Sequence, residues 1–194
     1  SLENLGAEIA AGGIEQAAVQ ARLDQMRKAA RELTRVAWLD DSGQVRASSG
    51  TPAATPAPSR EAALLAQQTG NGRYSRPLAT GQGAARMDYH LPLTRDGFHA
   101  GSLVASYDLD ALLDETVPWW FAQDNAVALL DADDKMVARR ESAGPGRGVY
   151  THNRPLDLNG AELLLATNSV KAAPRLLPNL LVGSVVLLAL GLLA

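Results

Sequence analysis

The stretch from Val36 to Val45, which reads VAWLDDSGQV, decides the fold that we expect for this chain. Apolar and polar residues alternate up to Asp40, as they do along a half-buried β-strand. Asp41-Ser42-Gly43 then has the composition of a tight turn, and the residues from Gln44 to Ser48 return with the same alternation. The sequence therefore predicts a β-hairpin that begins near Arg35.

The same pattern returns later in the chain. Residues Ala126 to Arg139 read AVALLDADDKMVAR and again place an acidic turn between two apolar stretches. The ends of the two units also match, because Gly101 to Tyr107 reads GSLVASY and Gly160 to Thr167 reads GAELLLAT. Internal similarity of this kind indicates a duplicated supersecondary unit. We predict an α+β protein with two antiparallel-sheet units, of which the second is smaller and lacks the middle helix.

Between the two hairpins, the sequence predicts a short helix, three strands and a connecting helix. Ser59 is a candidate N-cap of the short helix from Arg60 to Gln68, which follows a Pro-rich loop. Asp110 is a candidate N-cap of the connecting helix, which Pro118 closes. Trp119-Trp120-Phe121 come next and are interpreted as a wedge between the two units. The predicted strands are Arg73–Ala79, Ala85–Thr94 and His99–Tyr107.

Before the first hairpin, apolar or small residues recur from Leu2 to Leu33 in one heptad phase. The pattern predicts a long helix over residues 1–34, in which Gly12-Gly13 is a weak point that can kink. Two interpretations of its apolar stripe remain open. The stripe packs on the chain's own domain, or it forms the seam of a parallel homodimer in the full-length protein. The residues proposed for this dimer helix are Leu23, Met26, Ala30 and Leu33.

The end of the chain is strongly apolar, because Leu176 to Ala194 contains no charged residue. A helix of that length is about 28 Å long, close to the thickness of the hydrocarbon core of a bilayer. We therefore predict a truncated transmembrane helix over residues 174–194 and a lipid bilayer as a partner of the chain.

Composition and motifs argue against several classes of function. A net charge of −3 offers no basic face for nucleic acid, and the lack of cysteine excludes disulfide and thiol chemistry. The three histidines are scattered without the spacing of metal ligands. The acidic group Asp131-Ala132-Asp133-Asp134 lacks the glycine and the glutamate of a calcium loop. We expect that this chain is not an enzyme and that it uses no cofactor or metal.

The order of elements resembles one family: the double-Cache, or PAS-like, extracytoplasmic sensor region of bacterial sensor histidine kinases, similar to the dicarboxylate sensor kinases. Val36–Val45 and Gly101–Tyr107 carry the resemblance. It implies a ligand-sensing input region of a two-component histidine kinase whose cytoplasmic output lies outside this chain. The same module on a chemoreceptor or diguanylate cyclase is an alternative, as is a membrane-anchored periplasmic scaffold or enzyme without a signalling role.

The resemblance also implies the domain boundaries and the location of the chain. Residues 35–108 form a membrane-distal sensor unit, residues 109–124 a connecting helix and linker, and residues 125–173 a membrane-proximal unit. Residues 1–173 lie in the periplasm, next to the bacterial inner membrane.

The ligand site is expected in the first unit, where the middle helix and the Pro-rich loop can enclose a cavity. Along Ala85–Thr94, alternation places Arg86, Asp88 and His90 on one face, which either meets solvent or lines that cavity. Arg73, Arg76 and Arg86 are close in the predicted sheet, so their guanidinium groups could hold a small carboxylate. The further candidates are Tyr74, Asp88, Tyr89, Ser102 and Ser106.

One sequence feature bears on the ligand class. The amino-acid-binding subgroup of the family shows the signature Arg-x-Trp-Tyr, whereas Arg86-Met87-Asp88-Tyr89 has Asp in place of Trp. This departure argues against amino-acid recognition, and three clustered arginines against one nearby aspartate favour a small anion such as an organic acid.

Overall fold

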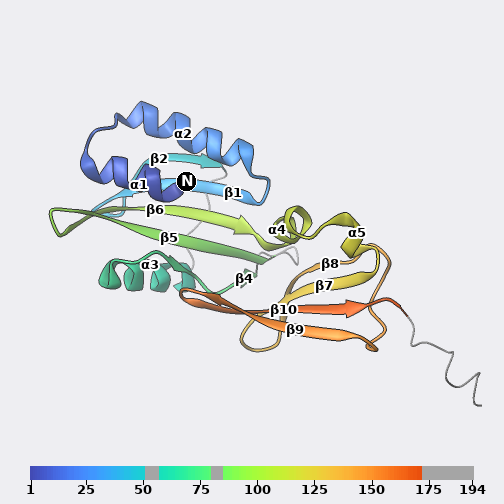
Figure 1. The fold of residues 1–194 in the computed structure, drawn as a ribbon. Helices are drawn as coiled ribbons and strands as arrows, with labels where there is room; N and C mark the ends of the chain where they lie inside the picture. Colours follow the sequence, from blue (N-terminus) through green and yellow to red (C-terminus); the bar gives the residue numbers. More distant parts are fainter. Residues whose placement is uncertain (51–56, 80–84, 172–194) are drawn as a thin grey trace, which may run out of the picture.

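The computed structural model describes residues 1–50, 57–79 and 85–171. It confirms the α+β class, with two antiparallel sheets in the strand orders β2-β1-β6-β5-β3 and β8-β7-β10-β9, and with β4 paired to β5 (Figure 1). The first sheet consists of β1 (Leu33–Asp40), β2 (Val45–Gly50), β3 (Arg73–Tyr74), β4 (Leu78–Ala79), β5 (Ala85–Arg95) and β6 (Phe98–Asp108). The second sheet consists of β7 (Asn125–Leu130), β8 (Met136–Arg140), β9 (Thr151–Leu158) and β10 (Ala161–Ser169). The helices are α1 (Leu2–Ala11), α2 (Gln16–Ala29), α3 (Ala57–Thr69), α4 (Leu109–Thr116) and α5 (Trp119–Ala122).

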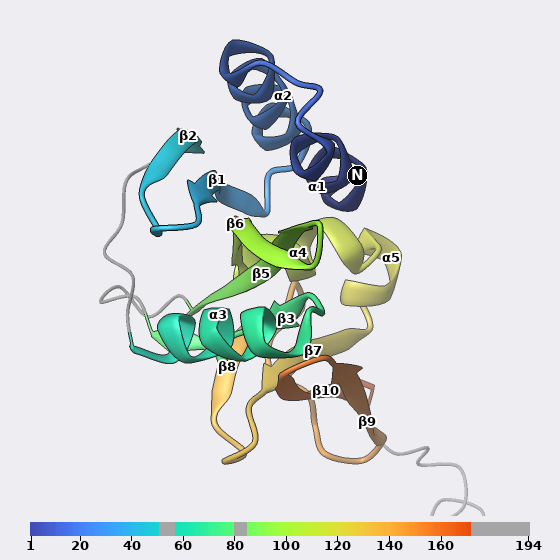
Figure 2. The ribbon, with the colours of Figure 1, turned by 90° about the vertical axis from the view of Figure 1, so that its left-hand side faces the viewer.

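The first sheet lies between two helical layers, with α1 and α2 on one face and α3 on the other (Figure 2). The alternation of β6 explains this arrangement. Leu103 and Ala105 are buried in the core beneath α1 and α2, whereas Ser102 and Val104 point to the α3 side. The face under α3 is thus more polar than the face under α1 and α2.

The predicted long N-terminal helix is divided into two, which corrects the single helix expected over residues 1–34. Gly12 ends α1 in the left-handed conformation, with φ 74°, and its N–H donates to Ile9 O at 3.0 Å. The chain then folds back, because Arg22 pairs with Glu8 at 2.7 Å, whereas fourteen residues of continuous helix would separate them by about 21 Å.

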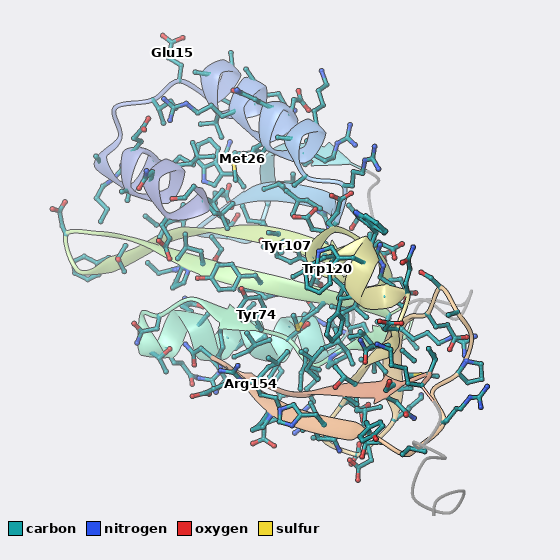
Figure 3. The ribbon with its side chains drawn as sticks, turned by 45° about the vertical axis from the view of Figure 1, so that its right-hand side comes forward. Glu15, Met26, Tyr74, Tyr107, Trp120 and Arg154 are labelled. Carbon is teal, nitrogen blue, oxygen red and sulfur yellow. The ribbon has the colours of Figure 1, made fainter. Side chains whose placement is uncertain are left out.

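The apolar stripe of α2 packs on the chain's own first sheet. Leu23 is 0% exposed and Leu33, which begins β1 rather than ending the helix, is also buried in the first core. Met26 and Ala30 are partly buried against the same core, and Met26 points from α2 toward the sheet (Figure 3). Of the two interpretations of the stripe, the structure shows packing on its own domain. The homodimer stays a prediction.

The internal repeat is visible in hydrogen bonds as well as in strands. In the first hairpin, Asp40 Oδ1 accepts from Ser42 N at 3.0 Å and from Gln44 N at 2.9 Å. In the second, Asp131 Oδ1 accepts from the N–H groups two and four residues later at 3.0 and 2.9 Å. Both hairpins also shift register just before the turn. The Asp131 side chain therefore stabilises the β7–β8 turn.

The connection between the units differs in detail from the expectation. Asp108, not Asp110, caps α4, since its Oδ1 accepts from Ala111 N at 2.9 Å. The second core joins the units, because it combines Met87 of β5 with residues of α4 and of the second sheet. Of the wedge expected between the units, only Phe121 packs against this core, whereas Trp119 and Trp120 are exposed.

Within the described part of the chain, no helix is long and apolar enough to cross a membrane. The transmembrane helix predicted over residues 174–194 lies outside the described residues.

Candidate functional site

A pocket of about 420 Å³ lies between α3 and the first sheet. Its floor comes from β1, β5 and β6, its wall from α3, and its rim from the β1–β2 turn. The polar and charged residues that line it are Arg35, Asp40, Asp41, Ser42, Ser59, Arg60, Gln67, Arg86, Asp88, His90, His99 and Ser102. Its volume is within the range of pockets that bind small molecules.

Successive side chains of β5 point to opposite faces of the sheet, so every second residue can reach the pocket. Arg86, Asp88 and His90 line it, whereas Met87 is buried in the core on the other face. Asp88 and His90 are each 3% exposed. The sequence left open whether this polar face meets solvent or a cavity, and the structure shows a cavity.

A buried polar network joins β5 to α3. The Ser59 hydroxyl donates to Asp88 Oδ2 at 2.6 Å and lies 2.9 Å from His90 Nε2. Arg86 Nε lies 3.2 Å from Asp88 Oδ1, close enough for the charges to pair but without hydrogen-bond geometry. Because Ser59 has one proton and gives it to Asp88, Nε2 of a neutral His90 carries the proton and donates to Ser59. Nδ1 of His90 is then an acceptor.

Several buried polar atoms of the pocket have no hydrogen-bond partner among the described residues. They are Arg86 Nε, Asp88 Oδ1, His90 Nδ1 and His99 Nδ1. A buried polar group without a partner costs about 1–3 kcal/mol, so such groups in native proteins usually serve a ligand or a bound water. Their concentration beside one pocket makes this pocket the candidate site of the structure.

Burial lowers the pKa of His90 from its ordinary value of 6.5, and the neighbouring Asp88 opposes this effect. The unfolded chain therefore takes up a proton at His90 at a higher pH than the folded chain does. We expect the free energy of unfolding to decrease as the pH falls from about 7 to about 5. Urea unfolding of a His90→Gln variant should show a shallower decrease over the same range. An unchanged pH slope in that variant would contradict a neutral, buried His90.

Solved structures with a similar fold are ligand-binding domains of bacterial receptors. The chain aligns with the domain of the Pseudomonas aeruginosa PAO1 amino acid chemoreceptor PctC in complex with GABA, at 15% identity and a TM-score of 0.58, over 86% of this chain and 87% of that one. It aligns with the domain of the Pseudomonas fluorescens chemoreceptor CtaA in complex with L-valine at 18% identity and a TM-score of 0.58, over 89% and 87% of the two chains.

An extracellular ligand-binding receptor from Desulfohalobium retbaense gives a TM-score of 0.59 at 12% identity, over 86% of this chain and 35% of that one. The chemoreceptor domains are double-Cache domains. This chain has the double-Cache fold. No protein-family model matches the sequence, and no curated protein matches it.

The double-Cache fold brings only part of the predicted site together. Arg86, Asp88 and Ser102 line the pocket. Ser106 is buried on β6, four residues beyond Ser102, and does not line it. Tyr74 and Tyr89 pack against each other with ring centroids 4.6 Å apart, and each packs against one of the two cores.

The predicted cluster of three arginines does not form. Arg73 and Arg76 line a separate pocket of about 560 Å³ between the units, together with Asp131, Asp133 and the β9–β10 turn. The β3 strand, which carries Arg73, ends after two residues, and the chain does not continue as one strand to residue 79. Arg86 keeps its place in the first pocket, but its charge is paired with Asp88.

The structure adds pocket residues that the sequence did not single out. Ser59 was expected to cap α3, yet the helix begins at Ala57 and the hydroxyl reaches Asp88. Arg35 and Arg60 also line the pocket, from β1 and α3. His99 does so from the start of β6. The sequence signals that pointed here were the repeating polar face of β5 and the middle helix of the first unit.

Proposed function

We propose that this chain is the extracytoplasmic ligand-sensing input region of a membrane-bound bacterial receptor. The observation that carries the proposal is the first pocket, which charged and polar side chains of β5 and α3 line and beside which several polar atoms lie buried without a hydrogen-bond partner. The double-Cache fold supports it, because the similar structures are ligand-binding domains of receptors. Residues 1–173 then lie in the periplasm, and the apolar stretch from Leu176 onward anchors the chain in the inner membrane.

Two kinds of cytoplasmic output are compatible with this input region. The sequence favoured a two-component sensor histidine kinase, with a phosphorelay as its output. A chemoreceptor is the second candidate, because similar structures belong to chemoreceptors and a chemotaxis protein. The coding sequence downstream of residue 194 discriminates the two, since a kinase carries a phosphoacceptor histidine and an ATP-binding domain, whereas a chemoreceptor continues as a long coiled coil.

The ligand proposed for the first pocket is a small carboxylate that also carries a hydrogen-bond donor. The Arg86 guanidinium lines the pocket beside its paired carboxylate, and a guanidinium group suits a carboxylate oxygen. Asp88 Oδ1 and His90 Nδ1 are acceptors, which suit a hydroxyl or ammonium group of the same molecule. Hydroxy acids and amino acids both have this chemistry, and GABA and L-valine, the ligands named for PctC and CtaA, carry a carboxylate and an ammonium group.

Two hydrogen bonds hold the second unit against the segment that follows α3, one between backbone groups and one from a side-chain amide. Tyr74 N donates to Asn159 O at 2.7 Å, and Asn159 Nδ2 donates to Gly72 O at 2.6 Å. These residues place the β9–β10 turn against β3, directly after α3. A ligand that pulls α3 toward β5 therefore shifts the part of the chain that the second unit holds, which gives the signal a route toward the membrane.

Filling the pocket tests the proposal. Ser102 lies on the pocket floor, so a Ser102→Phe substitution should occupy the space and weaken binding at least about tenfold, or about 1.4 kcal/mol. Calorimetry on the full chain would compare hydroxy acids, amino acids, plain carboxylates and phosphate. Thr94→Phe, on the exposed end of β5, is the matched control and should bind as the native chain does. Binding of a carboxylate that survives Ser102→Phe would place the site elsewhere.

A further inference from the structure

Large apolar side chains gather on the surface of the second unit. Trp119 is 67% exposed and Trp120 is 60% exposed on the short helix α5. Val149 and Tyr150 are exposed in the loop before β9. Single exposed apolar residues are ordinary on a protein surface, but a group of this kind at one place usually marks a contact site.

Hydrogen bonds place these residues around the end of β10. Asp124 O, directly after α5, accepts from Val170 N at 2.9 Å, and Tyr150 O accepts from Ser169 N at 2.9 Å. Both segments therefore flank the point at which the chain leaves the second sheet. This end of the sheet lies opposite the β9–β10 turn that touches the first unit (Figure 1). Trp120 lies on the outer side of the molecule at α5 (Figure 3).

The chain continues from this patch into its most apolar stretch. Lys171 follows β10, and the uncharged run from Leu176 to Ala194 begins only a few residues later. Trp and Tyr favour the interface between lipid and water, because their rings are apolar and their N–H or O–H groups remain hydrated. Arg147, exposed in the same loop as Tyr150, supplies positive charge for phosphate headgroups, whereas Lys171 is paired with Asp124 at 2.8 Å.

We propose that Trp119, Trp120 and Tyr150 form an interfacial anchor that rests the second unit on the headgroup region of the bilayer. The anchor rests on the membrane attachment proposed above. With this contact, the end of β10 is held at the lipid surface by side chains as well as by the chain that follows it. A movement of the second sheet is then transmitted to the membrane segment rather than absorbed by a free linker.

Quenching by brominated lipids tests the anchor, because the chain has three tryptophans and only two of them belong to it. The full chain would be reconstituted in vesicles of phosphatidylcholine and phosphatidylglycerol in equal parts, with bromine placed near the headgroup end of the acyl chains. A Trp38→Phe variant reports on Trp119 and Trp120. A Trp119→Phe/Trp120→Phe variant reports on Trp38, which lies on β1 of the first unit and serves as the matched control.

We expect shallow bromine to remove about half or more of the emission of the Trp38→Phe variant and less than about a tenth of the emission of the control. Vesicle flotation separates this result from the membrane attachment itself. If both variants float with the vesicles and neither is quenched, the chain is attached but the anchor is absent. If neither floats, both the attachment and the anchor are wrong. Equal quenching of the two variants would also overturn the anchor. The anchor would be overturned as well if a second copy of the chain covered Trp119 and Trp120 and thereby protected them from bromine.

Discussion

Replacing Asp88 by alanine should lower the free energy of unfolding by about 3–5 kcal/mol, because it leaves the Arg86 charge buried without its carboxylate. Asp88 is 3% exposed, and the Arg86 side chain is 17% exposed. The substitution also removes the acceptor of the Ser59 hydroxyl and with it a bond between α3 and β5. Urea unfolding monitored by circular dichroism would measure the loss.

The matched control is Asp133→Ala, which removes an exposed carboxylate from the β7–β8 turn and should change stability by less than about 0.5 kcal/mol. A double variant, Arg86→Met with Asp88→Leu, should recover most of the loss, since well-packed apolar residues replace a buried ion pair with little cost. If Asp88→Ala lowers the free energy of unfolding by less than about 1 kcal/mol, the network does not stabilise the packing of α3 on β5. The polar face of β5 is then hydrated.

The second large effect is expected in the first core. A Leu23→Ala substitution should cost about 2–5 kcal/mol, because Leu23 is 0% exposed between α2 and the first sheet and its loss leaves a cavity. Leu64 on α3 is 59% exposed, so Leu64→Ala is the matched control and should cost less than about 1 kcal/mol. Both would be measured by urea unfolding at a low protein concentration.

This comparison also separates the two interpretations of the α2 stripe. If Leu23 served a seam between subunits, its loss would reduce dimer formation in sedimentation experiments and leave the stability of the monomer nearly unchanged. That outcome would contradict the packing of α2 on its own sheet.

The sequence predicted most of the first sheet because its strands show local signals. Alternation and a turn with the composition Asp-Ser-Gly were sufficient for the first hairpin, and the repeat then predicted the second. In both, a single aspartate at the strand end closes the turn through its own side chain. Such bonds join residues a few positions apart, so a local pattern carries the information.

The errors concern features that depend on distant parts of the chain. The heptad pattern of apolar residues continues without interruption across Gly12. It therefore could not show that the chain folds back there and that Arg22 forms an ion pair with Glu8. The β9 strand was not predicted, because as an edge strand it keeps most side chains exposed and contains Pro155.

The site was predicted in part for the same reason. Period two placed Arg86, Asp88 and His90 on one face of β5, which is a local property of the strand. Arg73 and Arg76 were expected beside Arg86. The sequence could not show that the strand ends after Tyr74, or that Arg73 and Arg76 line a pocket shared with the second unit. Ser59 reaches Asp88 only through the packing of α3 on the sheet, and no pattern in the sequence predicts that contact.

Nitrogen NMR of the three histidines tests the central claim, that the first pocket binds a small carboxylate through its buried polar group. His90 and His99 line the pocket, whereas His152 is exposed on β9 of the second unit and acts as an internal control. The full chain, labelled with ¹⁵N at histidine, would be titrated with hydroxy acids and amino acids. At least one of them is expected to shift the ring nitrogens of His90 and His99 in a saturable way and to leave those of His152 unchanged. A carboxylate that binds while His90 and His99 stay unshifted would contradict this claim.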